Sequence, residues 1–192
     1  MSLIRHPIIQ YAYVVEDIDA AIHKWNRVFG AGPFLKIEHW GPADKHLYRG
    51  QPIRDDVTHA HGQCGPAQIQ FTQQHNDAPS IWRDMYPKGS EGFHHVAVLV
   101  DDFDEEKARF IQMGCSVGEE FQFNTSHAGH VHVPAGTKIP EIGRCAYMDA
   151  RHLIGCFVEV FEEHPIVRHE FNAVKAAHEN WDGVTDLIRY SI

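Results

Sequence analysis

A stretch of ten residues occurs twice in this chain, and this internal repeat limits the possible folds more than any other feature. The segment Gln10-Tyr-Ala-Tyr-Val-Val-Glu-Asp-Ile-Asp19 returns 85 positions later as His95-Val-Ala-Val-Leu-Val-Asp-Asp-Phe-Asp104. In both copies a polar residue that can bind a metal opens an apolar strand, and an acidic pair ends it. We therefore interpret the chain as one structural unit written twice, which allows a single site to be built from two halves.

Hydrophobic periodicity predicts the same order of elements in both copies. In the first copy, apolar residues from Ile18 to Phe29 recur at helical spacing, and Asp17 is a plausible N-cap for this helix. Predicted strands of the first copy cover residues 8–15, 34–40, 57–63 and 67–73. In the second copy a helix is expected over 102–113, with strands near 93–100, 117–123, 143–149 and 156–162. Each unit is therefore predicted to be βαβββ.

This pattern divides the 192 residues into three parts. The first unit is expected over residues 1–80 and the second over 81–163, of which 81–92 form a connector. A C-terminal helical extension is expected over 164–192. The extension contains four apolar residues: Phe171, Val174, Trp181 and Leu187. We expect them to pack on the rest of the chain or on a second subunit, and the sequence does not distinguish these two possibilities. A homodimer is the expected assembly.

Composition excludes several classes of function. The formal net charge is −9 and no Lys/Arg block is present, so nucleic acid is not an expected partner. No apolar run reaches the roughly 18 residues of a membrane span, and the N-terminus lacks the apolar segment of a signal peptide, so no membrane partner and a cytoplasmic location are expected. The 4 cysteines lack C-x-x-C spacing, which argues for reduced thiols. The 16 histidines hint at metal or proton chemistry.

Strand alternation indicates where that chemistry would lie. Gln10 shares a strand face with Ala12, and His95 shares a face with Ala97, so each polar residue has a small neighbour beside it. On the last strand of each unit, Gln70 and Glu159 stand between apolar residues. A carboxylate in such a strand needs a partner.

These four residues resemble the ligand positions of the vicinal oxygen chelate superfamily, to which glyoxalases, bleomycin resistance proteins and extradiol dioxygenases belong. The resemblance covers roughly residues 7–163. It implies an α+β glyoxalase-like fold, in which two tandem βαβββ units form a cupped mixed sheet around a divalent metal. The ligands come from the first and last strands of the units, here Gln10, Gln70, His95 and Glu159.

Two families within the superfamily are the most similar. The segment from Gly92 to Asp104 resembles methylmalonyl-CoA epimerases, in which the second histidine of the pair, here His95, is a ligand. Gln70 matches the motif now written Ile-Gln-Phe, and Glu159 matches the motif Val-Glu-Val. Gln10 departs from the epimerase pattern, which has His at that position, whereas animal glyoxalase I enzymes are similar in accepting Gln there.

This ligand set predicts enolising chemistry. Three oxygen ligands and one imidazole suit Mg²⁺, Mn²⁺, Co²⁺, Ni²⁺ or Zn²⁺ better than Fe²⁺, and they leave positions for a small carbonyl or thioester substrate. The expected activity is that of a lyase, isomerase or epimerase which stabilises an enediolate. The resemblance to glyoxalase I implies that Glu159 could serve as both ligand and base. His59 and His61, on one face of a predicted strand, are candidates for moving the proton.

Other interpretations stay open. A metal-free protein of this fold could bind a small molecule, with the glutamine amides hydrogen-bonded in a polar cavity and His95 paired with Glu159. An Fe²⁺ extradiol dioxygenase would require two His and one carboxylate, and these positions contain one His. Glu38, Asp55 and Asp56 are alternative bases. His130 and His132 form another possible chelating pair, in a stretch from 124 to 143 that could form a lid.

Overall fold

The computed structural model describes residues 5–41, 44–124 and 136–190, and these divide into two compact units. We name each after its first repeat residue. The Gln10 unit comprises Gln10–Gly41, Asp55–His94 and Glu170–Ile192. The His95 unit comprises Met1–Ile9, Pro42–Arg54 and His95–His169. Helix α5 (Pro165–Glu179) begins in the His95 unit and ends in the Gln10 unit.

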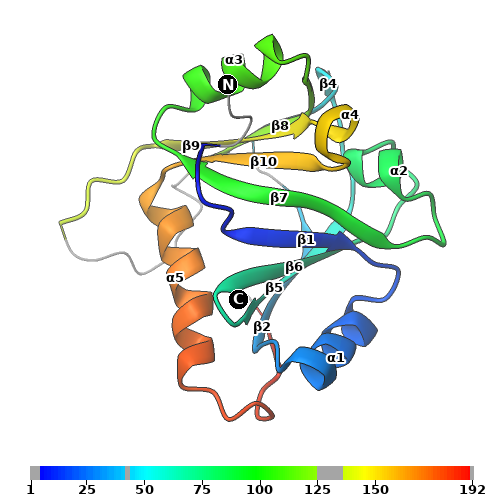
Figure 1. Cartoon of the computed structure of the whole chain (residues 1–192), viewed down its shortest axis with the longest axis vertical. Coiled ribbons are helices and arrows are strands. Elements are labelled where there is room, and N and C mark those ends of the chain that lie inside the picture. The colour runs from blue at the N-terminus through cyan, green and yellow to red at the C-terminus, as the bar shows by residue number, and fades with distance from the viewer. Residues whose placement is uncertain (1–4, 42–43, 125–135, 191–192) are drawn as a thin grey trace. The chain divides into compact units, whose positions relative to one another are not determined.

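The Gln10 unit contains a mixed sheet, helices α1 and α2, and the C-terminal part of α5 (Figure 1). Its sheet order is β11-β2-β5-β6-β1, in which β1 is parallel to β6, β11 is parallel to β2, and the other neighbours are antiparallel. The strands are β1 (Gln10–Val14), β2 (Phe34–Trp40), β5 (Val57–Cys64), β6 (Ala67–Gln74) and β11 (Ile188–Tyr190). Helix α1 covers Ile18–Phe29 and helix α2 covers Ile81–Met85.

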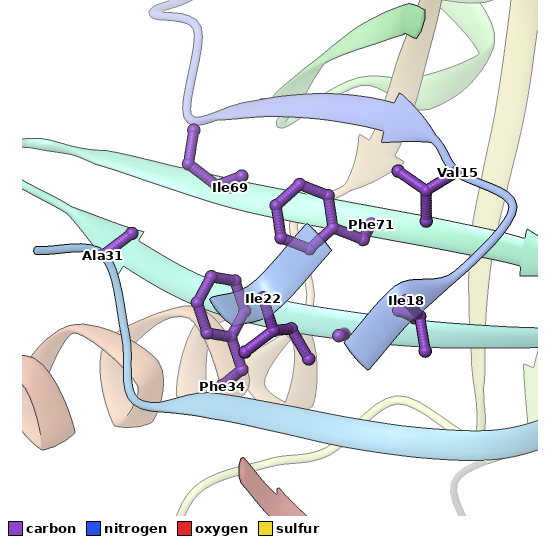
Figure 2. Packing of buried hydrophobic residues seen from close by; sticks show 8 residues of the cluster. Val15, Ile18, Ile22, Ala31, Phe34, Ile69 and Phe71 are labelled. Atoms are coloured by element: carbon purple, nitrogen blue, oxygen red, sulfur yellow. The ribbon is translucent and has the colours of Figure 1, made fainter. Parts of the chain in front are cut away.

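Helix α1 covers one face of this sheet and closes its hydrophobic core. Asp17 caps the helix by accepting a hydrogen bond from the Ala20 N–H at 2.9 Å, and Gly30 ends it in the left-handed conformation. Figure 2 shows Ile22 of α1 facing Phe34 of β2, with Phe71 of β6 nearby. Each fully buried side chain of this size stabilises the fold by about 1.5–3 kcal/mol.

The His95 unit repeats the arrangement with different side chains. Its sheet order is β7-β10-β9-β8-β3-β4, with β7 parallel to β10 and the rest antiparallel (Figure 1). The strands are β3 (Asp44–Tyr48), β4 (Gln51–Pro52), β7 (Gly92–Val100), β8 (Ser116–Asn124), β9 (Ile142–Asp149) and β10 (Phe157–Glu162). Helix α3 (Phe103–Gln112), capped by Asp102, packs on β8, β9 and β10, and the short helix α4 covers Arg151–Ile154.

The structure confirms the α+β class and both βαβββ patterns, and it adds elements that the periodicity did not predict. The hairpin β3–β4 lies within the first repeat and is largely polar, so it lacks an apolar alternation. Helix α2 lies in the expected connector, and three residues of the extension that we expected to be helical form β11. A three-residue strand is too short to show a period. The predicted boundaries at residues 80 and 163 stay a prediction.

None of the described helices is both long and apolar enough to cross a lipid bilayer.

Candidate metal and catalytic site

His95 and Glu159 meet inside the His95 unit. The parallel pairing of β7 and β10 sets Glu159 opposite Ala97, two residues after His95, so the two polar side chains share a sheet face. Their Nε2 and Oε2 atoms are 3.2 Å apart, and the exposed fractions of the side chains are 0% and 2%. The small side chain of Ala97 leaves this approach open, as strand alternation predicted.

The two carboxylate oxygens of Glu159 differ in their hydrogen bonds. Its Oε1 accepts a hydrogen bond from the Cys145 thiol at 3.5 Å. Its Oε2 is buried and accepts no hydrogen bond from the described residues, although His95 Nε2 is close. The approach of these two atoms is thus a close contact without hydrogen-bond geometry. A buried carboxylate oxygen beside an imidazole nitrogen is a donor set that fits a divalent cation.

Two neutral donors surround this carboxylate. Burial raises the pKa of the Tyr147 phenol well above its usual value, and the negative charge of Glu159 raises it further. Burial likewise raises the pKa of the Cys145 thiol, again with a contribution from Glu159. Both groups therefore keep their protons at neutral pH. The Tyr147 ring also packs edge-on against the His95 ring, with centroids 5.1 Å apart, which restricts the imidazole.

A second buried pair of the same kind lies in the same unit, and sequence reasoning did not find it. His46 Nε2 is 2.9 Å from Glu119 Oε1, with side-chain exposures of 8% and 1%. Glu119 is the β8 residue paired with Tyr147, and its charge also contributes to the raised pKa of that phenol. Glu119 gave no signal, because its neighbours in sequence are Gly118 and Glu120 and not the apolar residues that flank Glu159. His46 gave none, because it comes from the unpredicted hairpin.

In the Gln10 unit, Gln10 is held by its amide nitrogen. Gln10 Nε2 donates to Gln68 Oε1, its cross-strand neighbour on β6, and lies 3.4 Å from His61 Nδ1. Its Oε1 is buried and accepts no hydrogen bond from the described residues. An amide fixed through nitrogen with its oxygen free has the orientation that metal ligation through oxygen requires.

Gln70 and the two candidate proton-transfer histidines share this face. Gln70 Nε2 is 3.1 Å from both His59 Nδ1 and Thr72 Oγ1, and His59 Nδ1 is 3.0 Å from the same hydroxyl. His61 is the cross-strand neighbour of Gln70 on β5. The rings of His59 and His61 are 6.1 Å apart. The unit thus gathers Gln10, Gln70, His59 and His61 on one polar face, opposite the core beneath α1.

The alternative bases are already engaged. Asp55 is buried and accepts a hydrogen bond from the Trp82 indole at 3.1 Å. Glu38 and Asp56 have side chains more than a third exposed, and they form ion pairs with Lys36 and His39. All three residues are more exposed to solvent than Glu159.

The predicted ligands are therefore found as two pairs, one in each unit, and their union into a set of four stays a prediction. His130 and His132 lie outside the described residues, as does most of the predicted lid.

Comparison with known proteins identifies the family and the fold. The sequence matches the Glyoxalase/Bleomycin resistance protein/Dioxygenase superfamily over residues 9–131. A solved structure of a hypothetical protein from Bacillus halodurans is 15% identical, with a TM-score of 0.52, covering 83% of this chain and 96% of that one. A methylmalonyl-CoA epimerase from Mycobacterium tuberculosis is 15% identical, with a TM-score of 0.49, covering 87% and 93%. No curated protein matches the chain. At such identities the structural likeness indicates the fold alone.

Proposed function

Because the chain belongs to the glyoxalase/bleomycin resistance protein/dioxygenase superfamily, we propose that it is a metal-dependent lyase, isomerase or epimerase whose ion is bound by His95 and Glu159. The proposed substrate is a small carbonyl compound or a thioester. The observation that carries the proposal is the buried contact between His95 Nε2 and Glu159 Oε2, with the latter accepting no hydrogen bond from the described residues.

The surroundings of the pair support a role in proton transfer. A divalent ion bound there would supply a Lewis acid that favours formation of an enediolate. Glu159 is proposed to accept the α-proton of the substrate, and the protonated phenol of Tyr147 keeps the carboxylate oriented through a hydrogen bond. The edge-on contact of Tyr147 restricts the ring of His95.

The proposal also assigns roles to four residues of the Gln10 unit. Gln10 and Gln70 are proposed as further oxygen ligands, and the anchored amide nitrogen of Gln10 supports this. His59 and His61 are proposed to carry protons. His59 is buried in contact with Thr72 and Gln70, which would fix the tautomer of its ring.

The direct test is Glu159→Gln, with Glu120→Gln as the matched control. Glu120 lies in the same unit and pairs with Lys107 at the surface. Metal content after dialysis against Mn²⁺, Co²⁺, Ni²⁺ or Zn²⁺ would be measured, with α-proton exchange into deuterated water followed for a panel of α-hydroxy carbonyl compounds and thioesters. We expect Glu159→Gln to lose at least about tenfold in metal affinity together with exchange, and Glu120→Gln to change neither. Unchanged metal affinity in Glu159→Gln would contradict the proposal.

A metal-free protein that binds a small molecule is the second candidate. The contacts among Gln70, His59 and Thr72 favour it, because these buried polar groups satisfy one another without an ion. If no divalent ion binds after reconstitution, this function replaces the first. The expected homodimer stays a prediction, which light scattering of the purified chain would test.

A further inference from the structure

Three side chains gather at one end of the sheet in the Gln10 unit and take no part in the proposed function. His39 belongs to β2, Asp56 directly precedes β5, and His75 directly follows β6. One ligand atom from each lies within 4.8 Å of the other two. His39 Nδ1 is 2.7 Å from Asp56 Oδ1, and the rings of His39 and His75 are 4.9 Å apart.

The sheet itself brings these residues together. β5 pairs with β2 on one side and β6 on the other, so that Val57 faces Trp40 and Gln74. The three residues of the cluster are each adjacent in sequence to one of these partners. The His75 N–H also donates to the Asp56 carbonyl at 2.8 Å, which closes the end of the sheet. Backbone pairing thus fixes the spacing of the cluster before any ligand binds.

The backbone of His39 redirects its side chain toward the cluster. Its φ is +49°, and the register of β2 against β5 shifts between Ile37 and Trp40. Positive φ is uncommon for residues other than glycine, and irregularities of this kind turn a side chain away from the normal alternation. The uncommon conformation is therefore what brings the His39 ring beside Asp56.

The hydroxyl group of Thr58 contacts His75, the third residue of the cluster. Thr58 Oγ1 is 2.7 Å from His75 Nε2 and also accepts a hydrogen bond from the His39 N–H at 3.4 Å. If His75 bound a metal through Nδ1, it would donate Nε2–H to this hydroxyl. Metal-binding histidines usually donate their other ring N–H in this manner.

The local charge favours a cation. The cluster borders a surface hollow that is also lined by four carboxylates and one lysine. The lysine, Lys36, is paired with Asp19 at 2.8 Å and with Glu38 at 3.3 Å, so its charge is compensated. The lining carboxylates are Glu16, Asp17, Asp19 and Glu38.

We propose that His39, Asp56 and His75 form a second metal site, selective for borderline divalent ions such as Zn²⁺, Ni²⁺ and Co²⁺ over Mg²⁺ and Ca²⁺. Two imidazoles and one carboxylate match the preference of these ions, whereas Mg²⁺ and Ca²⁺ favour oxygen ligands alone. None of the three residues belongs to the proposed catalytic set. The ion would join the ends of β2, β5 and β6, so it would stabilise the fold by binding the native state only.

The test uses the Glu159→Gln chain, in which binding of the proposed catalytic ion is weakened and the surface site is intact. Zn²⁺ is added in equilibrium dialysis and thermal unfolding, and Mg²⁺ serves as the second probe. Variants His39→Ala and His75→Ala are compared with His23→Ala, which removes an exposed histidine of α1 in the same unit. Far-ultraviolet circular dichroism establishes that each variant is folded.

We expect one Zn²⁺ per chain, a rise in melting temperature with Zn²⁺ and none with Mg²⁺. His39→Ala and His75→Ala should each weaken Zn²⁺ binding at least about tenfold, whereas His23→Ala should not. Equal binding in all three variants, or an equal response to Mg²⁺, would overturn this site. Because this site is tested in chains with Glu159→Gln, and the catalytic site can be tested in chains with His39→Ala and His75→Ala, failure of one proposal leaves the other measurable.

Discussion

The two units share a backbone and differ in the chemistry placed on it. In both, the first strand pairs in parallel with the last, and the polar residue of the last strand faces an alanine: Gln70 opposite Ala12, and Glu159 opposite Ala97. The residue opposite the first-strand ligand position differs, however. Gln68 faces Gln10 and holds its amide, whereas the apolar Phe157 faces His95. The repeat has kept the register, while one unit has an anchored amide and the other a buried histidine beside a carboxylate.

The largest predicted effect follows from removing His95 from its buried pair with Glu159. His95→Ala in protein treated with chelator leaves Glu159 buried beside no imidazole, so we expect the free energy of unfolding to fall by about 3–5 kcal/mol. Gln10→Ala removes neutral contacts of its amide with Gln68 and His61, and we expect about 1–3 kcal/mol. Urea denaturation measures both. Equal costs for the two variants would break the comparison, because the pairs would then be energetically alike.

Although their polar residues differ, both units pack a glycine of one strand against an aromatic ring of the neighbouring strand. In the Gln10 unit Gly62 lies opposite Phe34, and a Cβ at Gly62 would meet the ring at 2.5 Å. Gly143 faces Phe123 in the same manner in the His95 unit. We expect Gly62→Ala to destabilise the chain by about 1–3 kcal/mol through overpacking, measured by the urea midpoint. Gly65→Ala is the control for a glycine with no atom within 4 Å, although its positive φ adds a small cost of its own. A smaller loss at Gly62 than at Gly65 would contradict this account of the packing.

The smallest predicted effect concerns acid sensitivity in the His95 unit. Hydrogen bonds from Arg151 lower the pKa of Asp149 below its ordinary value of 3.8, and a bond from Arg49 adds to this. A carboxyl whose pKa is lower in the folded state stabilises the fold above its unfolded pKa, and this contribution is lost as the pH falls through the folded value.

Asp149→Asn should therefore cost about 1 kcal/mol at neutral pH and have progressively less effect below pH 3.8. Urea denaturation of both chains across this range is the measurement. A cost that is independent of pH would show that Asp149 contributes through packing and not through its charge.

The repeated backbone was predictable from sequence because its signals are local. Apolar spacing and the capping position of Asp17 were sufficient to predict α1, whose helix is confirmed from Ile18 to Phe29. Strand alternation also put His95 and Ala97 on one face of their strand, because parity within a strand depends only on residue number. The pairing that sets Glu159 opposite Ala97 depends on the register between two strands, which alternation does not give.

The missed features depend on contacts that sequence spacing does not record. The hairpin that supplies His46 is polar and short, so no period indicates it, and its pairing with Glu119 joins residues 73 positions apart. The positive φ of His39 is likewise set by a register shift between two strands. Strand β11 is defined by its pairing with β2 and not by any pattern of its own.

The most direct test of the central claim is the metal stoichiometry of a His39→Ala/His75→Ala chain, which lacks the surface cluster, beside the same double variant with Glu159→Gln added. We predict close to one divalent ion per chain where Glu159 is intact, after dialysis against Mn²⁺, Co²⁺, Ni²⁺ or Zn²⁺, and a loss of at least about tenfold in affinity where Glu159→Gln is added. Equal metal content in the two chains, or none in either, would contradict the assignment of His95 and Glu159 as metal ligands.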